Sequence, residues 1–204
     1  MTGPVRIDRV VTSGTFSLDG GTWDVDNNVW VVGDDDECVV VDAAHDGQPI
    51  IEAVDGRRVV AVLLTHAHDD HIGAVRQVWD ATRGPSYLHP QDRMLWDRVH
   101  PVSPDRSMDD GDRIAVAGAE VRVLHTPGHS PGACCFYVPT LGVVFTGDTL
   151  FNGGPGATGR SFSDYPTILE SISSKLLTLP PETVVHTGHG DDTTIGAEAA
   201  RLRG

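Results

Sequence analysis

The segment THAHDDHIGA, residues 65–74, places three histidines and two aspartates within six consecutive positions. Imidazole and carboxylate groups together favour a borderline divalent metal, zinc above all. The segment comes directly after RRVVAVLL, residues 57–64, whose apolar run predicts a buried strand. A loop that is held at the end of a rigid strand is a common place for functional side chains. The segment therefore predicts a metal site at one strand end.

Three more polar residues follow predicted strands much later in the chain, namely His129, Asp148 and His189. With the first cluster, and leaving out Asp69, which does not match the ligand pattern, they offer five histidines and two aspartates, which exceed one four-coordinate zinc site that keeps an open position. The count predicts two metals that share one carboxylate and one hydroxide and lie about 3.5–4 Å apart. Structural zinc sites are commonly rich in sulfur, so a donor set without cysteine favours a site that activates water.

The elements that must position these residues follow from the apolar pattern. Residues 5–44 predict antiparallel strands, with valine-rich runs at 28–33 and 37–44 around a polar turn. Further strands are predicted at 57–64, 86–90, 113–118, 120–126, 133–138, 142–147 and 180–188, and helices at 48–54, 72–82, 90–99, 162–179 and 193–202. Each half is rich in strands and then helical, which predicts one domain over residues 1–204 with a two-sheet core and helices outside.

Composition narrows the classes of function. The 204 residues carry a net charge of −14 and one lysine, so neither a nucleic acid nor an anionic membrane is an expected partner. The longest apolar run, residues 59–64, is too short to span a bilayer, and the start of the chain lacks the apolar run of a signal peptide. An odd number of cysteines, two of them adjacent, does not predict a disulfide framework. We therefore expect a cytoplasmic protein that acts on a small molecule.

The polar segments resemble one known family. HAHDDH at 66–71 matches the HxHxDH motif of the metallo-β-lactamase fold superfamily, and HTPGHSPGA, FTGDTLF and HTGHG resemble its later motifs in the same order. The resemblance covers nearly the whole chain and implies an α+β fold, the αββα sandwich, in which two packed mixed β-sheets are flanked by helices. It assigns His66, His68 and His129 to a first metal, Asp70, His71 and His189 to a second, and Asp148 to both as a bridge.

Within that superfamily the chain most resembles the short bacterial glyoxalase II-like proteins, through FTGDTLFNGG, GATGRSFSDY, KLLTLPPETVVHTGHG and DDTTIGAE. The resemblance implies hydrolysis of a thioester of a small thiol, with S-lactoylglutathione as the reference substrate. Two divalent ions, expected to be Zn²⁺ with iron or manganese as alternatives, would activate water, and Asp70 would orient the metal-bound hydroxide. We expect no C-terminal helical glutathione-binding domain, because residue 204 lies fifteen residues after His189. The thiol stays open between glutathione, mycothiol and others.

Other functions of the fold stay open. Persulfide dioxygenases, which use one iron, have overlapping motifs, and further hydrolases of the fold act on lactones or phosphodiesters. A metal-binding module without turnover is a third alternative. A β-lactamase is disfavoured, because Asp148 stands where lactamases of this fold commonly place a cysteine ligand.

Several residues near the motifs are candidates for supporting roles. Arg160 and Tyr165 follow the glycine-rich loop after Asp148 and are candidate substrate contacts, since arginine binds a carboxylate through two hydrogen bonds; the alternatives are a surface arginine and a packing tyrosine. Asp42 is a candidate partner of a ligating histidine, and Asp69 is either such a partner or a helix N-terminal residue. Residues predicted to have no direct role are the packing cysteines Cys134 and Cys135 and the non-ligand histidines His45, His89, His100, His125 and His186.

Overall fold

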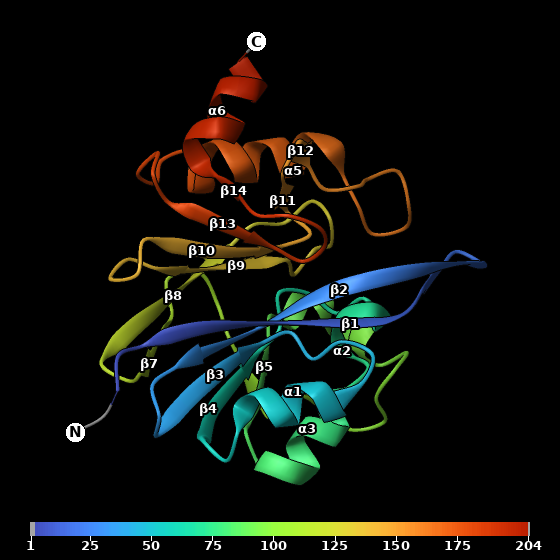
Figure 1. Cartoon of the computed structure of the whole chain (residues 1–204). Helices are drawn as coiled ribbons and strands as arrows, with labels where there is room; N and C mark the ends of the chain where they lie inside the picture. The colour runs from blue at the N-terminus through green and yellow to red at the C-terminus, as the bar shows by residue number, and fades with distance from the viewer. Residues whose placement is uncertain (1–2, 204) are drawn as a thin grey trace.

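The computed structural model describes residues 3–203, and its elements form four layers (Figure 1). Helices α1 (Gly47–Val54) and α3 (Val75–Thr82) cover the outer face of one sheet, and α5 (Tyr165–Ser171) and α6 (Ile195–Arg203) cover the outer face of the other. The predicted αββα sandwich is confirmed.

The first sheet contains the N-terminal strands. Its order along the sheet is β1 (Arg6–Leu18), β2 (Gly21–Gly33), β3 (Glu37–Val41), β4 (Arg58–Leu63), β5 (Ser86–Leu88) and β6 (Arg106–Ser107). The pairs β1–β2 and β2–β3 are antiparallel, as predicted, whereas β3 to β6 pair in parallel, so the sheet is mixed. The hairpin of β1 and β2 reaches beyond the rest of the sheet (Figure 1).

The second sheet contains the C-terminal strands. Its order is β14 (Thr193–Thr194), β13 (Val184–Thr187), β10 (Val143–Gly147), β9 (Cys134–Val138), β8 (Ala119–His125) and β7 (Arg113–Val116). Only β10 and β13 pair in parallel among its described strands, so this sheet is mixed as well. A two-stranded hairpin of β11 (Leu150–Phe151) and β12 (Gly154–Pro155) follows β10.

The helices differ by more than one residue from the predicted ranges in four places. Residues 193–194, predicted as the start of the last helix, form the strand β14, and α6 begins at Ile195. The predicted helix at 72–82 is two helices, α2 (Asp69–Ile72) and α3, so α2 begins inside the histidine cluster. The segment predicted at 90–99 is a 3₁₀ turn, η1 (Pro90–Asp92), followed by α4 (Arg93–Trp96). The helix predicted at 162–179 begins at Tyr165, because the Asp164 side chain accepts a hydrogen bond from the backbone of Thr167, and it continues as a π-helical turn, η2 (Ile172–Leu176).

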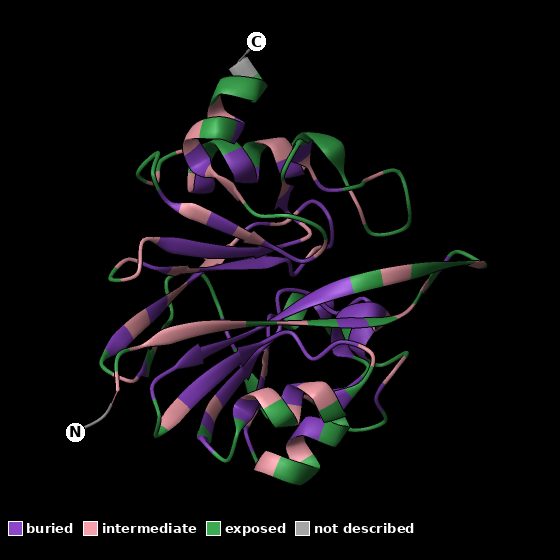
Figure 2. Cartoon of the chain, viewed as in Figure 1, coloured by how far each residue is buried: buried purple, intermediate pink, exposed green. Residues whose placement is uncertain are grey.

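Three apolar clusters fill the three spaces between the layers. Along β2, Val29 and Val31 pack toward α1 and α3, while Trp30 and Val32 pack between the sheets, as strand alternation requires. Cys134 lies between the sheets and Cys135 faces the C-terminal helices, which confirms that they pack on opposite faces. Figure 2 shows the buried strands in purple and the exposed outer sides of the helices in green.

The described residues also bear on two predictions from composition. All three cysteines are free and buried, so no disulfide is present among residues 3–203. No helix in that range is both long enough and apolar enough to cross a membrane.

Candidate metal centre

The structure brings all seven predicted ligands to one end of the sandwich. The cluster at 66–71 follows β4 of the first sheet, and His129, Asp148 and His189 follow β8, β10 and β13 of the second. Donor atoms lie within 4.8 Å of one another in three groups: His66, His68 and His129; His66, His71 and Asp148; Asp70, His71 and His189. The first and third groups are the two trios predicted for separate metals, and the second places Asp148 between them.

Hydrogen bonds on one ring nitrogen determine which nitrogen faces the centre. His71 Nδ1 lies 2.8 Å from the Asp42 carboxylate, and His129 Nδ1 lies 2.8 Å from the Ala157 carbonyl. His189 Nδ1 lies 2.7 Å from the Asp26 carbonyl. Carbonyl oxygens, and carboxylates when ionised, only accept hydrogen bonds, so each Nδ1 is the donor. In a neutral ring, Nε2 then carries a lone pair, which is the form that binds metal.

In the neutral form of the rings, these lone pairs face one another. Nε2 of His71 and Nε2 of His189 are 3.3 Å apart, and Asp148 Oδ1 lies 3.3 and 3.4 Å from them. Among residues 3–203, hydrogen-bond partners are also lacking for four buried atoms of the site: His66 Nε2, His68 Nε2, Asp70 Oδ1 and Asp148 Oδ1. An unsatisfied buried polar group costs about 1–3 kcal/mol, so a set of acceptors that faces inward in this way fits bound cations.

The electrostatics of the two trios differ. Although burial opposes a charge on His71, the carboxylates of Asp70, Asp148 and Asp42 hold its pKa well above the ordinary value. Burial is likewise outweighed at His189, where Asp148 and Asp70 raise the pKa to about 10. The trio around the carboxylates therefore attracts positive charge.

The other trio favours uncharged rings. Burial and neighbouring histidines lower the pKa of His66 well below its ordinary value and that of His68 to about 3. Neutral imidazoles are ready to coordinate a metal without first losing a proton.

Two aspartates of the motif region have different roles. Asp42 accepts hydrogen bonds from the backbone N–H of Thr65 at 2.8 Å and from His71 at 2.8 Å, so it does contact a predicted ligand. Asp69 is the first residue of α2 and accepts hydrogen bonds from the backbone N–H of Ser17 at 3.1 and 3.2 Å. Of the two alternatives for Asp69, the helix N-terminal position is the one observed.

A cleft of about 350 Å³ opens onto the centre. Predicted ligands that line it include His68, Asp148 and His189, and Arg160 lines it as well. Tyr165 is 54% exposed and is not among the lining residues, so its contact with a substrate stays a prediction.

The tip of the β1–β2 hairpin forms one wall of this cleft. Phe16 stacks on Trp23 and its ring centroid lies 5.1 Å from that of His68. The guanidinium carbon of Arg160 lies 3.8 Å from the Trp23 ring centroid, close enough for a cation–π contact. The backbone N–H of Ser161 also donates to Asp19 at the hairpin turn, so the loop that carries Arg160 is fastened to the hairpin.

A family model for the metallo-beta-lactamase superfamily matches residues 22–189. The chain belongs to this superfamily. This chain has several relatives that carry functional names. It is 36% identical over 189 residues to the "Probable metallo-hydrolase YqgX" of Bacillus subtilis, with 84% of this chain and 88% of the relative covered. It is 32% identical over 181 residues to "Hydroxyacylglutathione hydrolase GloC" of Haemophilus influenzae, with 81% and 85% covered.

Solved structures that are similar to this chain include the following two. TTHA1623 in a di-iron-bound form is 36% identical, with a TM-score of 0.77 and 86% of this chain and 93% of the other covered. BLEG-1, a B3 metallo-beta-lactamase, is 33% identical, with a TM-score of 0.78 and coverage of 93% and 97%. These likenesses and the histidine–aspartate groups support a metallo-hydrolase that binds divalent metal.

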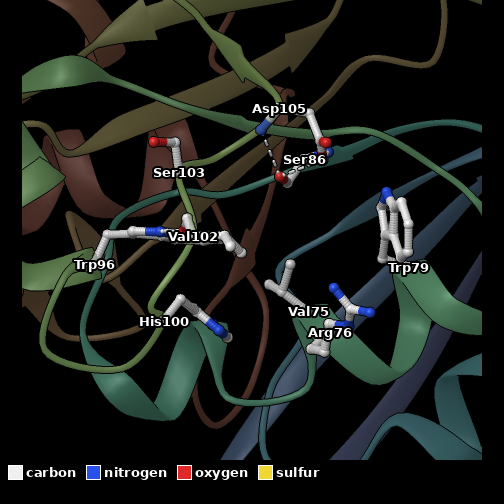
Figure 3. Close-up of a pocket in the computed structure, with 9 residues that line it drawn as sticks. All are labelled: Val75, Arg76, Trp79, Ser86, Trp96, His100, Val102, Ser103 and Asp105. Carbon is white, nitrogen blue, oxygen red and sulfur yellow. Dashed lines mark hydrogen bonds between the residues drawn. The ribbon is translucent and has the colours of Figure 1, made fainter.

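The five histidines predicted as non-ligands lie outside the three donor groups found within residues 3–203. His89 and His125 stack on each other at 3.9 Å, and His186 packs on Trp30 at 4.3 Å. His45 Nε2 lies 2.7 Å from Asn27 Oδ1. His100 Nε2 donates to the Ile72 carbonyl and lines a separate pocket of about 210 Å³ beside α3 (Figure 3), whose lining shares no residue with that of the metal cleft.

Two residues that hydrogen-bond to a predicted ligand or to the backbone beside one were not identified from the sequence. Asn27 donates to Asp70 Oδ2 at 3.1 Å, and Asn28 donates to the carbonyls of Thr187 and Gly190, on either side of His189. Both asparagines are buried in the middle of β2. Two consecutive polar residues directly before an apolar run are the signal that points to them.

Proposed function

We propose that the chain is a dinuclear metal-dependent hydrolase that cleaves thioesters of a small thiol. The observation that carries the dinuclear part is the pair of donor trios on either side of Asp148, which exceeds the donors that one ion needs. The thioester part is supported by the similarity to the hydroxyacylglutathione hydrolase GloC and by Arg160 in the lining of the cleft.

The residues divide between two cations. His66, His68 and His129 would hold the first and Asp70, His71 and His189 the second, with Asp148 touching both. Ions bound there would lower the pKa of a water between them to near 7 and polarise the substrate carbonyl. Zinc is proposed because imidazole and carboxylate donors suit it, and the di-iron form of TTHA1623 makes iron the alternative to test.

Asp70 is proposed to orient the attacking water. Asn27 holds its Oδ2, while its Oδ1 is buried without a hydrogen-bond partner among the described residues and remains available to accept a proton from water. In the reaction, the water oxygen gives up a proton and bonds to the thioester carbon, the carbon–sulfur bond breaks, and the sulfur leaves as a thiolate that takes a proton from solvent. A thiolate is a good leaving group, so no dedicated general acid is needed.

Arg160 is proposed to bind the part of the substrate that does not react. No ion pair or side-chain hydrogen bond of its guanidinium to another described residue competes with a substrate. The cation–π contact with Trp23 holds the guanidinium beside the cleft, and arginine pairs with a carboxylate through two hydrogen bonds. A thiol that carries a carboxylate, as glutathione does, fits this position.

The test combines metal analysis with a panel of substrates. The protein is loaded separately with zinc and with ferrous iron, and the ions per chain are counted. Each form is offered S-lactoylglutathione, acyl esters of other small thiols, a lactone, a phosphodiester and a β-lactam. We expect two ions per chain and thioester cleavage that exceeds the cleavage of every other substrate.

A second assay addresses the persulfide dioxygenase. Both forms are given glutathione persulfide in an oxygen electrode. Oxygen uptake by the iron form, together with no thioester cleavage by either form, would overturn the proposal. Preference for the β-lactam, as the similarity to BLEG-1 makes worth testing, would overturn the thioester part and leave the dinuclear part intact.

A further inference from the structure

Asp92 is a buried carboxylate that the proposed reaction does not use. It ends η1, has no exposed surface, and accepts three hydrogen bonds. Its Oδ2 accepts from the backbone N–H of Ala67 at 3.0 Å and from the Ser130 hydroxyl at 2.7 Å, and its Oδ1 accepts from the backbone N–H of Gly132 at 2.5 Å.

The three donors flank predicted metal ligands on two separate loops. Ala67 stands between His66 and His68, after a strand of the first sheet, whereas Ser130 and Gly132 follow His129, after a strand of the second. One carboxylate therefore joins the two loops that supply the whole first trio. His68 Nδ1 and His129 Nε2 are 3.0 Å apart across this junction, so a shift of either loop changes the spacing of the donors.

The absence of a side chain at Gly132 leaves room for this carboxylate. A Cβ atom at Gly132 would lie 2.8 Å from the Asp92 Cγ and 2.7 Å from the Asp92 backbone nitrogen, closer than atoms pack. The glycine of the HSPG sequence, residues 129–132, is thus explained by the approach of Asp92. Burial raises the pKa of Asp92, so without its three donors this carboxylate would not suit an interior position.

We propose that Asp92 is a positioning residue for the first metal site, and that its hydrogen bonds to the two loops set the affinity of His66, His68 and His129 for a cation. The inference rests on the metal assignment of the proposed function but not on the thioester substrate. A protein that binds two ions and cleaves some other substrate leaves it standing.

The test uses Asp92→Asn in the full chain, with metal binding as the readout. Asparagine keeps the size but turns one acceptor into an NH₂ group that faces N–H and O–H donors. Affinities for the two ions are measured by competition with a chromophoric chelator, and the cobalt(II) form is followed by its visible absorption spectrum. We expect the affinity for one ion to fall about tenfold or more, with a changed cobalt spectrum, while the affinity for the other ion is retained.

The matched control is Asp34→Asn. Asp34 is also buried and accepts hydrogen bonds from the backbone N–H groups of Asp36 and Glu37, but it lies in the turn between β2 and β3 and contacts no ligand loop. We expect it to lower stability without changing either metal affinity. If Asp92→Asn lowers stability in the same way and also leaves both affinities and the cobalt spectrum unchanged, the positioning role is refuted.

A milder variant keeps the test valid if Asp92→Asn does not fold. Ser130→Ala removes one of the three hydrogen bonds and should weaken binding of the same ion by a smaller factor. A folded Ser130→Ala protein with wild-type affinities and cobalt spectrum would then count against the proposal. A wild-type protein that holds only one ion would contradict the dinuclear assignment before any variant is compared.

Discussion

Asp148 lies between the two donor trios of the centre. Its Oδ1 lies 3.3 Å from His71 Nε2 and its Oδ2 lies 3.5 Å from His129 Nε2, so its two oxygens point to different trios. The neighbouring His71 and His189 outweigh burial and hold the pKa of Asp148 well below its ordinary value, so the carboxylate is charged at neutral pH. A charged carboxylate between two donor trios is suited to bridge two cations.

Asp148→Ala should therefore weaken the binding of both ions and abolish hydrolysis. Elemental analysis after gel filtration is the measurement, with His125→Ala as the control. His125 donates from Nε2 to the Pro131 carbonyl and lies outside the donor groups found in residues 3–203, so its variant should keep both metals. An Asp148→Ala protein that kept most of its metal and activity would show that this residue does not bridge.

Arg160 should affect substrate binding more than the chemical step. We expect Arg160→Ala to raise KM about tenfold for a thioester that carries a carboxylate, with kcat nearly unchanged, because the contact is equally strong before and during the reaction. Steady-state kinetics with the acid and its neutral amide would measure this, and the amide should show no change. The matched control is Arg83→Ala, since Arg83 also stacks on a tryptophan, Trp79, but away from the cleft. Equal effects on acid and amide would argue against a carboxylate contact.

At the scale of the element, each group of predicted ligands follows a strand, and this is why the residues that the sequence singled out could be expected to lie together. Valine-rich runs identified β4, β8, β10 and β13, and each is followed within a few residues by a histidine or aspartate of a motif. Asp92 could not be identified in the same way, because its role depends on loops that are distant in sequence. Trp23 was missed for a similar reason, as its contact with Arg160 depends on how the hairpin is placed.

The elements that were not predicted are short. The strands β6, β11 and β12 have two residues each, too few to show an alternating pattern. The division of the 72–82 helix at Gly73 and Ala74 has no helix-breaking proline to mark it. The short α2 places Asp70 and His71 at the metal centre, so the geometry of the site, and not intrinsic helix propensity, determines the backbone conformation here.

The glycine of the HTGHG segment gives a prediction at this scale. A Cβ at Gly188 would lie 2.5 Å from Asp148 Oδ1 and 3.0 Å from the His71 ring. We expect Gly188→Ala to displace these side chains, lower the free energy of unfolding by about 1–3 kcal/mol and reduce the metal content. Urea titration and elemental analysis would measure the two effects.

Gly111→Ala separates backbone strain from displacement of ligands. Gly111 has a φ of 85° but open space around it, so alanine there should cost about 1 kcal/mol and leave both metals bound. If Gly188→Ala retained both metals at wild-type affinity, the close approach to Asp148 would be unimportant.

At the scale of the whole molecule, the centre connects the two sheets. His66 to His71 belong to the first sheet's loop, and the remaining ligands belong to the second sheet. Between the sheets lies a core that includes Trp30, Phe136 and Phe145. Bound ions would thus add a polar cross-link at one end of a largely apolar interface.

Removal of metal should therefore lower the thermal stability. A ligand at 100 times its Kd adds about 2.7 kcal/mol to the free energy of unfolding, which corresponds to a Tm shift of about 5–10 °C for a chain of this size. Differential scanning calorimetry with and without a chelator would measure it. The same chelator should hardly change the Tm of Asp148→Ala, and an equal drop in both proteins would mean that the chelator acts elsewhere.

The distance along the chain between His71 and His189, 118 residues, has a consequence for biosynthesis. At a translation rate of roughly 5–20 residues per second, the ribosome extends the chain from His71 to His189 in about 6–24 seconds. During that interval the nascent segment 66–71 lacks His189, and His129 and Asp148 are added only part-way through it. The trio of Asp70, His71 and His189 is consequently complete only after translation has passed His189, so we expect the ion that fills it to be chosen from those available to a nearly finished chain.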